Sequence, residues 1–202
     1  MKTKVFFSLA TLLLSTSLVF GQSIDSAKIK RSNFDNYDEL RANQKRLGID
    51  TLTYLDSIFN YKVQIPYWLQ LRETGSATTI GGTLPPVNGI ENAILIKGFP
   101  KSEFKSFEEF EEIYLTGNKF GQPTKYSKEH IWYGQNELIK IENGVKQKVF
   151  TFWNNKIYHN LFILQETKSA YLWIQFTSTP DTYDLNISKF DEFMTGFKII
   201  NL

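Results

Sequence analysis

The feature that most constrains the fold is a run of three strand-like segments joined by very short connections. The segments are Val145–Trp153, Lys156–Glu166 and Ala170–Ser178, and all three are rich in β-branched and aromatic residues. Asn154-Asn155 forms the first connection and three residues form the second. Such short connections require antiparallel pairing, because parallel strands need a crossover of about a dozen residues or more. The run therefore predicts an antiparallel meander.

Alternation along these segments indicates how the meander is covered. Along the third segment, Tyr171 and Trp173 occupy one face of the strand. Leu172 and Ile174 occupy the other face, so both faces are apolar in the middle. A sheet with one solvated face would alternate between apolar and polar side chains. We therefore expect an α+β fold, in which helices and connecting segments cover both faces of an antiparallel β-sheet.

The first 21 residues have the features of a secretory signal peptide. Lys2 and Lys4 precede the apolar segment Val5–Leu14. Val19 and Gly21 occupy the positions before the cleavage site that signal peptidase recognises. The apolar segment is shorter than the roughly 20 residues of a membrane span, which favours a cleaved signal over a membrane anchor. We expect an exported protein, periplasmic or secreted, with no membrane insertion after cleavage.

Composition limits the partners and the chemistry of the remaining chain. Two of the 23 basic residues and none of the 21 acidic residues lie in the signal, so the remainder has no net charge. A neutral chain without a run of Lys or Arg gives no electrostatic reason to bind nucleic acid. The chain contains no cysteine, which excludes disulfides, thiol catalysis, thiolate metal ligands and a lipid-modified N-terminal cysteine.

The domain organisation follows from changes in composition along the chain. Residues 22–50 are polar and mixed in charge, and we expect a mobile N-terminal arm or a short helix there. Residues 51–202 have the length of one α+β domain. Within this domain, Arg72–Ile90 contains four glycines and two prolines, which predicts a long loop. Loops of this length in compact domains are often functional.

Two helices are predicted within this domain. Ser106 and Glu109 match a capping box at the start of the first helix, and Gly117 is expected to end it in a left-handed conformation. The second helix is predicted over Lys189–Thr195, with Ser188 as its cap.

Two motifs resemble a known superfamily. Tyr61 to Trp68 reads Tyr-Lys-Val-Gln-Ile-Pro-Tyr-Trp and closes an opening hairpin. Phe190 to Lys198 reads Phe-Asp-Glu-Phe-Met-Thr-Gly-Phe-Lys and passes from a helix into a final strand. Through these motifs the chain resembles the PsbP-like superfamily over residues 52–200. The resemblance implies an antiparallel sheet between helices and non-catalytic binding or accessory work, and it implies no site residue.

The sequence has no pattern typical of catalysis or of metal binding. His130 and His159 are the only histidines, and neither has a second ligand at the spacing of a zinc site. The acidic residues around Glu109 lie on one predicted helix, and one helix face cannot surround a calcium ion. Neither a Gly-x-Ser-x-Gly motif nor a phosphate-binding glycine-rich motif occurs. We expect no catalytic residue, no metal and no cofactor.

Two adjacent aromatic pairs are the candidates for a binding site. In Tyr67-Trp68 and in Trp132-Tyr133, strand geometry would turn one ring of each pair toward solvent. Exposed rings stack on sugars or anchor protein partners. We expect a site formed by these four residues and Arg72, where the long loop meets the rings. The alternative interpretation is that all four rings belong to the core.

Three functions follow as hypotheses. The first is an exported, soluble, non-catalytic binding or accessory protein, whose partner is an unknown protein or glycan. The second is a glycan-binding module that uses Trp68 or Trp132. The third is a small hydrolase with His130 or His159 as its base, and a cleft with a histidine hydrogen-bonded to a carboxylate would favour it.

Overall fold

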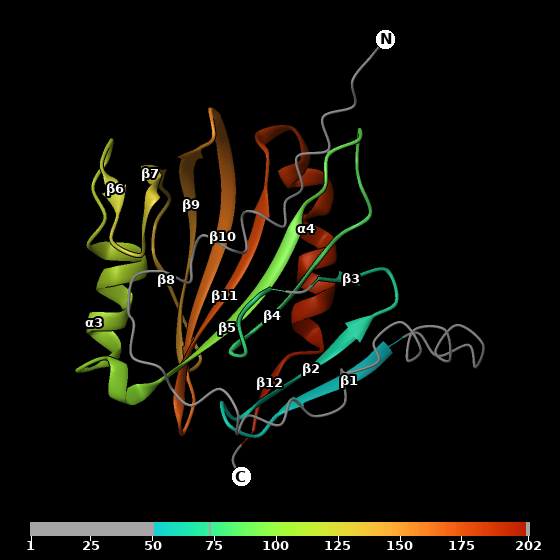
Figure 1. The fold of residues 1–202 in the computed structure, drawn as a ribbon, viewed down its shortest axis with the longest axis vertical. Coiled ribbons are helices and arrows are strands. Elements are labelled where there is room, and N and C mark those ends of the chain that lie inside the picture. Colours follow the sequence, from blue (N-terminus) through green and yellow to red (C-terminus); the bar gives the residue numbers. More distant parts are fainter. Residues whose placement is uncertain (1–50, 73, 201–202) are drawn as a thin grey trace.

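A computed structural model describes residues 51–72 and 74–200 of the chain. These residues form two antiparallel sheets with helices packed against them, which confirms the α+β class (Figure 1). The predicted signal peptide (1–21) and N-terminal arm (22–50) lie outside the described residues. Among the residues that are described, no helix is long and apolar enough to cross a membrane.

The large sheet has nine strands in the order β3-β4-β5-β11-β10-β9-β7-β6, with β8 also paired to β9, and the small sheet has the order β1-β2-β12. The strands of the large sheet are β3 Gln70–Leu71, β4 Thr79–Thr83, β5 Ala93–Pro100, β6 Pro123–Thr124, β7 Ser127–Gln135, β8 Ile139–Ile141, β9 Gly144–Trp153, β10 Lys156–Glu166 and β11 Ala170–Ser178. The small sheet consists of β1 Thr51–Asp56, β2 Tyr61–Pro66 and β12 Lys198–Ile199. The helices are the 3-10 turn η3 Lys101–Glu103, α3 Phe107–Glu111, the π-helical turn η4 Glu112–Thr116 and α4 Pro180–Thr195.

The meander predicted from the sequence is confirmed by strands β9, β10 and β11. Asn154 and Asn155 have φ angles of 47° and 58°, the left-handed conformation that a two-residue hairpin turn requires. Asn143, between β8 and β9, has a φ angle of 57°. Strand β11 pairs on its other side with β5, so the meander forms the centre of the large sheet.

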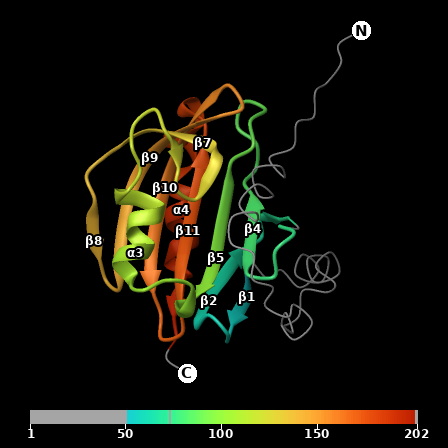
Figure 2. The same cartoon turned by 60° about the vertical axis from the view of Figure 1, so that its left-hand side comes forward.

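Helix α4 packs against one face of the large sheet, which we call the α4 face (Figure 2). Leu172 and Ile174 lie on this face and belong to one buried cluster with Phe190 of α4 and Val63 of β2. The ring of Phe176 stacks on that of Phe190 with 5.5 Å between their centroids. Burial of such side chains is worth about 1.5–3 kcal/mol each and fixes α4 and the small sheet to the large one.

The α3–η4 segment packs against the opposite face, which we call the α3 face. Tyr171 and Trp173 of β11 lie there, in a second buried cluster with Phe110 of α3 and Tyr114 of η4. The ring centroids of Phe110 and Tyr171 are 5.3 Å apart, and those of Tyr114 and Trp173 are 4.7 Å apart. Aromatic pairs at these separations contribute about 0.5–1.5 kcal/mol beyond their burial.

Complete cover of both faces by helices is not confirmed. On the α4 face of β9, the side chains of Phe150 and Phe152 are only half-buried. The same is true of Ile157 on β10, which pairs with Phe152. The α4 face is therefore open at the β7–β9 end of the sheet.

The prediction of one long loop over residues 72–90 is wrong, because strand β4 lies within it. β4 pairs with β3 on one side and with β5 on the other. Gly81 and Gly82 permit this, because a Cβ on Gly82 would lie 2.5 Å from the carbonyl oxygen of Gln70. Glycines within a strand often mark such a close approach of backbones.

The predicted helix ends also need correction. Helix α4 begins at Pro180 after the N-cap Thr179, nine residues before the predicted start at Lys189. Proline fits the first turn because its missing N–H would have no intrahelical partner there. Gly117 and Gly196 both have a φ angle of −85°, so neither ends its helix in the left-handed conformation that we expected for Gly117.

Candidate binding surface

The edge of the large sheet carries an exposed tyrosine because of a β-bulge. In the pairing of β7 with β9, Trp132 lies opposite Thr151 and Gly134 opposite Phe150, which leaves Tyr133 as an extra residue. Gly134 has a φ angle of +140°, a conformation that residues with a side chain rarely adopt. A bulge changes the direction in which the side chains of the strand point. Tyr133, the extra residue of this bulge, is 45% exposed.

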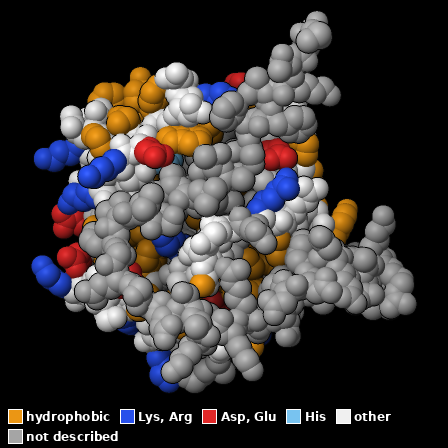
Figure 3. Space-filling model, viewed as in Figure 1, with side chains coloured by type: hydrophobic (Ala, Val, Ile, Leu, Met, Phe, Trp, Pro, Cys, Tyr) orange, Lys and Arg blue, Asp and Glu red, His pale blue; other side chains and the backbone are white. Residues whose placement is uncertain are grey.

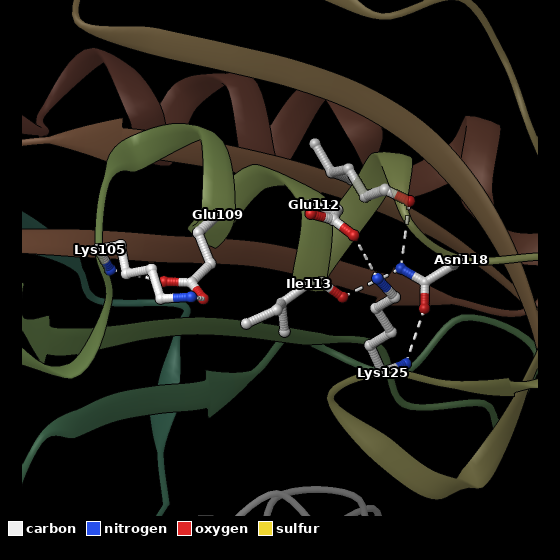
Figure 4. A network of polar contacts seen from close by, with 7 residues as sticks. Lys105, Glu109, Glu112, Ile113, Asn118 and Lys125 are labelled. Carbon is white, nitrogen blue, oxygen red and sulfur yellow. Dashed lines mark hydrogen bonds and ion pairs between the residues drawn. The ribbon is translucent and has the colours of Figure 1, made fainter.

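A second exposed ring comes from the loop that follows η4. Asn118 fixes the start of this loop, because its Nδ2 donates to the carbonyl oxygens of Ile113 and Leu115 at 3.1 Å (Figure 4). Its Oδ1 accepts from the backbone N–H of Lys125 at 2.8 Å. Phe120 lies between these two anchors and is 69% exposed.

The other end of the α3–η4 segment is also fixed by polar contacts. Ser106 Oγ accepts from the N–H of Glu109, as the predicted capping box requires, at 3.4 Å. The Glu109 carboxylate accepts from the N–H of Lys105 at 2.5 Å, one residue before the cap (Figure 4). The loop that carries Phe120 therefore starts from a helix held at both ends.

The rings of Phe120, Tyr133 and Phe152 form a continuous row. The ring centroids of Phe120 and Tyr133 are 5.2 Å apart with an angle of 37° between their planes. Those of Tyr133 and Phe152 are 6.5 Å apart with an angle of 34°. We call this row, with the half-buried Ile131 and Ile157 that pair with Phe152, the aromatic row. Figure 3, which looks onto the α3 face, shows hydrophobic side chains also on that side of the sheet, over the ends of β6 and β7.

Basic side chains flank the aromatic row. Lys146, Lys148, Phe150 and Phe152 occupy every second position of β9, so all four lie on the same face, and all are half-buried. Lys148 Nζ lies 3.7 Å from the ring centroid of Tyr183 on α4, a cation–π contact. Neither lysine forms an ion pair with a carboxylate among the described residues.

The structure separates the predicted site residues. Tyr67 and Trp68 lie between β2 and β3, and Arg72 follows β3, at the opposite edge of the large sheet from Trp132 and Tyr133. One ring of each aromatic pair is exposed, but regular strand geometry is not the reason, because Tyr67 and Trp68 lie in the turn after β2 and Tyr133 lies in a bulge. The rings therefore lie in two groups and do not surround a single loop.

Trp68 and Arg72 have protein partners of their own. Trp68 is half-buried against the cluster under α4, and its Nε1 donates to Glu192 Oε1 at 3.1 Å. Arg72 forms an exposed ion pair with Glu91 at 3.5 Å. Tyr67 is 67% exposed beside them.

Trp132 is 1% exposed, and its indole N–H donates to Gln135. A ring this deeply buried cannot stack on a sugar, so the glycan hypothesis loses one of its two tryptophans. Tyr133 is the member of this pair that reaches solvent.

The two histidines have different surroundings, and neither is hydrogen-bonded to a carboxylate within the described chain. His130 is buried, its Nδ1 lies 2.8 Å from Ser127 Oγ, and its ring stacks on Trp153. Burial lowers the pKa of His130 to about 4, so its ring is neutral near pH 7. His159 is half-buried, and burial followed by the charge of Lys148 lowers its pKa.

Sequence reasoning missed two of the three rings in the aromatic row, Phe120 and Phe152. Both stand in the sequence next to charged or polar residues, as aromatic core residues also do. One sequence signal could have found Phe152. Lys146, Lys148, Phe150 and Phe152 stand at every second position, which places two lysines and two rings on one face of β9. Among residues 51–72 and 74–200, no group of three or more metal-ligating side chains occurs.

Comparison with known proteins gives a resemblance of fold. No protein-family model and no curated protein sequence matches the chain. Among solved structures, cyanobacterial PsbP (CyanoP) from Synechocystis is 12% identical, with a TM-score of 0.46 over 74% of this chain and 92% of that one. A Pseudomonas aeruginosa protein of unknown function, described as a putative regulator, is 13% identical, with a TM-score of 0.43 over 71% of this chain and 93% of that one. The predicted PsbP-like resemblance is thereby confirmed as a weak likeness of fold.

Proposed function

We propose that the protein is an exported, non-catalytic binding protein that holds a protein partner on its aromatic row. The observation that carries this proposal is the exposure of Phe120 and Tyr133, 69% and 45%, within one row of touching rings. Aromatic side chains are enriched in the energetically important centres of protein interfaces. Export is inferred from the signal peptide pattern of the first 21 residues.

The geometry of the row favours a protein over a glycan. Successive rings are inclined by 37° and 34°, so they present an uneven surface and no common plane on which a row of sugar rings would stack. The neighbouring Ile131 and Ile157 are aliphatic and offer no hydrogen bonds to hydroxyl groups. The surface fits apolar side chains of a protein, which fill irregular spaces between rings.

The flanking charges specify the partner further. Lys146 and Lys148 lie on the face of the row, and Lys119 and Lys156 precede Phe120 and Ile157 in the chain. None of these lysines forms an ion pair with a described carboxylate. A partner segment that combines apolar residues with Asp or Glu would complement this surface.

Peptide selection on the purified protein tests the proposal. Peptides selected from a random library should combine aromatic or aliphatic residues with Asp or Glu. Calorimetry should show that the double variant Phe120→Ser, Tyr133→Ser binds them at least about tenfold more weakly, a loss of 1.4 kcal/mol or more. Added salt should weaken binding by the wild type because exposed charge pairs are screened.

Tyr67→Ser is the matched control, because Tyr67 is as exposed as Phe120 and lies at the opposite edge of the sheet. It should leave peptide binding unchanged. Equal affinity of the double variant and the wild type would overturn the proposal. Binding of an oligosaccharide panel that is lost with Trp68→Ala would instead support the glycan hypothesis.

A further inference from the structure

The α3 face contains a small cavity of about 20 Å³ beside Trp173. Its walls come from five strands, β5, β7, β9, β10 and β11, and from the segment between β6 and β7. Eight of its lining side chains carry a hydroxyl, amide, imidazole or indole group: Tyr126, His130, Thr151, Tyr158, Asn160, Trp173, Gln175 and Thr177. A polar cavity in the middle of an aromatic core needs a physical reason, because buried polar groups are costly without partners.

Most of these polar groups bond to one another. Asn160 Oδ1 accepts from Thr177 Oγ1 at 2.8 Å and from Gln175 Nε2 at 3.2 Å. Asn160 Nδ2 donates to Thr151 Oγ1 at 3.1 Å. The amide of Asn160 is therefore satisfied on both sides, and the network holds β9, β10 and β11 together at this point.

The indole N–H of Trp173 is the exception. Trp173 is 1% exposed and lines the cavity, and its Nε1 has no hydrogen-bond partner. An unpaired buried donor is rare in native proteins, because buried N–H groups nearly always bond to a protein group or to ordered water. Trp132 provides a contrast on the same face, since it is equally buried but donates to Gln135.

The size and the charge of the cavity define what fits there. A cavity needs roughly 10–15 Å³ to hold one water molecule, so about 20 Å³ accommodates one and no larger ligand. His130 is the titratable histidine in the lining, and burial keeps it neutral down to about pH 4. The phenols of Tyr126 and Tyr158 also line the cavity, and burial raises the pKa of both, so they are neutral as well. The lining therefore provides no charge to hold an ion.

We propose that this cavity binds a single water molecule that accepts the hydrogen bond of Trp173 Nε1–H. The remaining hydrogen bonds of the water go to the hydroxyl and amide groups that line the same space, of which Thr151 and Gln175 are two. The water is then a permanent part of the sheet, because it completes the polar network that joins the central strands.

Nuclear magnetic resonance of the purified, nitrogen-15-labelled protein tests this inference. The chain has four tryptophans, and Trp173→Phe and Trp132→Phe assign the two buried indole signals by their loss. The indole proton of Trp173 should show a direct cross-relaxation peak to water, and that of Trp132 should show none. A Trp173 proton without such a peak would overturn the inference.

An experimental crystal structure at high resolution gives a second measurement that needs no variant. Electron density for one water molecule within hydrogen-bond distance of Trp173 Nε1 is the expected result. An empty cavity, or a Trp173 indole bonded to a protein atom, would also overturn the inference.

Stability provides a third comparison. Trp173→Phe should lower the melting temperature about as much as Trp132→Phe does, since each removes a satisfied donor. A distinctly smaller decrease for Trp173→Phe would indicate a dry cavity.

Discussion

Two groups of aromatic rings lie on the large sheet, one buried under α3–η4 and one exposed in the aromatic row. Phe110 is fully buried, and Tyr114 is 7% exposed. Phe120 and Tyr133, which follow later in the chain, are 69% and 45% exposed. The two groups do not differ in residue type. They differ in what covers them, because the α3–η4 segment covers the first group on the α3 face, whereas the aromatic row lies at the β7–β9 end of the sheet, where the α4 face is open. Aromatic content alone therefore does not distinguish a core from a binding surface in this protein.

The largest expected difference between the two groups is in stability. Phe110→Ala removes a ring that contacts Phe104, Tyr114 and Tyr171, with centroid separations between 4.8 and 5.3 Å. We expect the free energy of unfolding to fall by about 3–5 kcal/mol. Phe120→Ala should change it by no more than about 0.5 kcal/mol, because the ring is largely solvated. Urea denaturation measures both, and similar losses would show that the aromatic row belongs to the core.

The second prediction concerns His130, which is buried like the rings under α3–η4. Burial lowers the pKa of His130 from 6.5 to about 4, so the unfolded chain binds more protons than the folded chain between these values. The contribution of the neutral His130 ring to the free energy of unfolding is therefore present in full above pH 6.5 and is lost as the pH falls from 6.5 to about 4. This contribution amounts to about 3 kcal/mol, at 1.36 kcal/mol for each pKa unit.

Comparison with His130→Gln isolates this contribution. The variant cannot titrate there, so its free energy of unfolding should decrease less than that of the wild type as the pH falls from 7 to 4. Carboxylates titrate in both proteins and cancel in the difference. The half-buried His159 provides the matched control, and His159→Gln should flatten the profile less. Parallel profiles for the wild type and His130→Gln would contradict the assigned burial.

The third prediction concerns the bulge that exposes Tyr133, where the expected loss of stability is smaller than for Phe110→Ala. Gly134→Ala places a side chain at a φ angle of +140° and should cost about 1–2 kcal/mol. Because relaxation of the bulge would turn Tyr133 away from Phe120, the variant should also weaken peptide binding. Gly89→Ala is a control with a positive φ angle of 76° far from the row, and it should affect stability alone. Unchanged peptide binding by Gly134→Ala would show that the bulge does not position the site.

Much of the fold followed from the sequence because local signals and packing agree there. The Asn154-Asn155 turn predicted the pairing of β9 with β10, and apolar side chains on both faces indicated a covered sheet. β4 was not predicted because Gly81 and Gly82 are poor strand formers. Their role depends on the backbone of β3 and β5. The first turns of α4 were missed because Pro180, Asp181 and Thr182 are also typical of loops.

The candidate site was less accessible to sequence reasoning. Tyr133 was a predicted site residue as one ring of a strand pair, and it is exposed, but its exposure depends on a bulge that only tertiary pairing creates. The link between Phe120 and Tyr133 depends on the anchors of Asn118, which join residues up to seven positions apart. The cavity beside Trp173 could be predicted only after all five strands were placed. In the sequence, Asn160 and Gln175 are polar residues within largely apolar strands, and nothing there shows that they meet.

The pairing of β12 with β2 has a consequence for how the chain is made. β12 supplies Lys198 and Ile199, which pair with Lys62 and Tyr61 near the beginning of the described chain. During synthesis, β2 therefore emerges long before the strand that completes its sheet. The small sheet cannot close until β12 has been synthesised, so the hairpin of β1 and β2 lacks its third strand until then. Deletion of β12 would leave one edge of β2 without its neighbour.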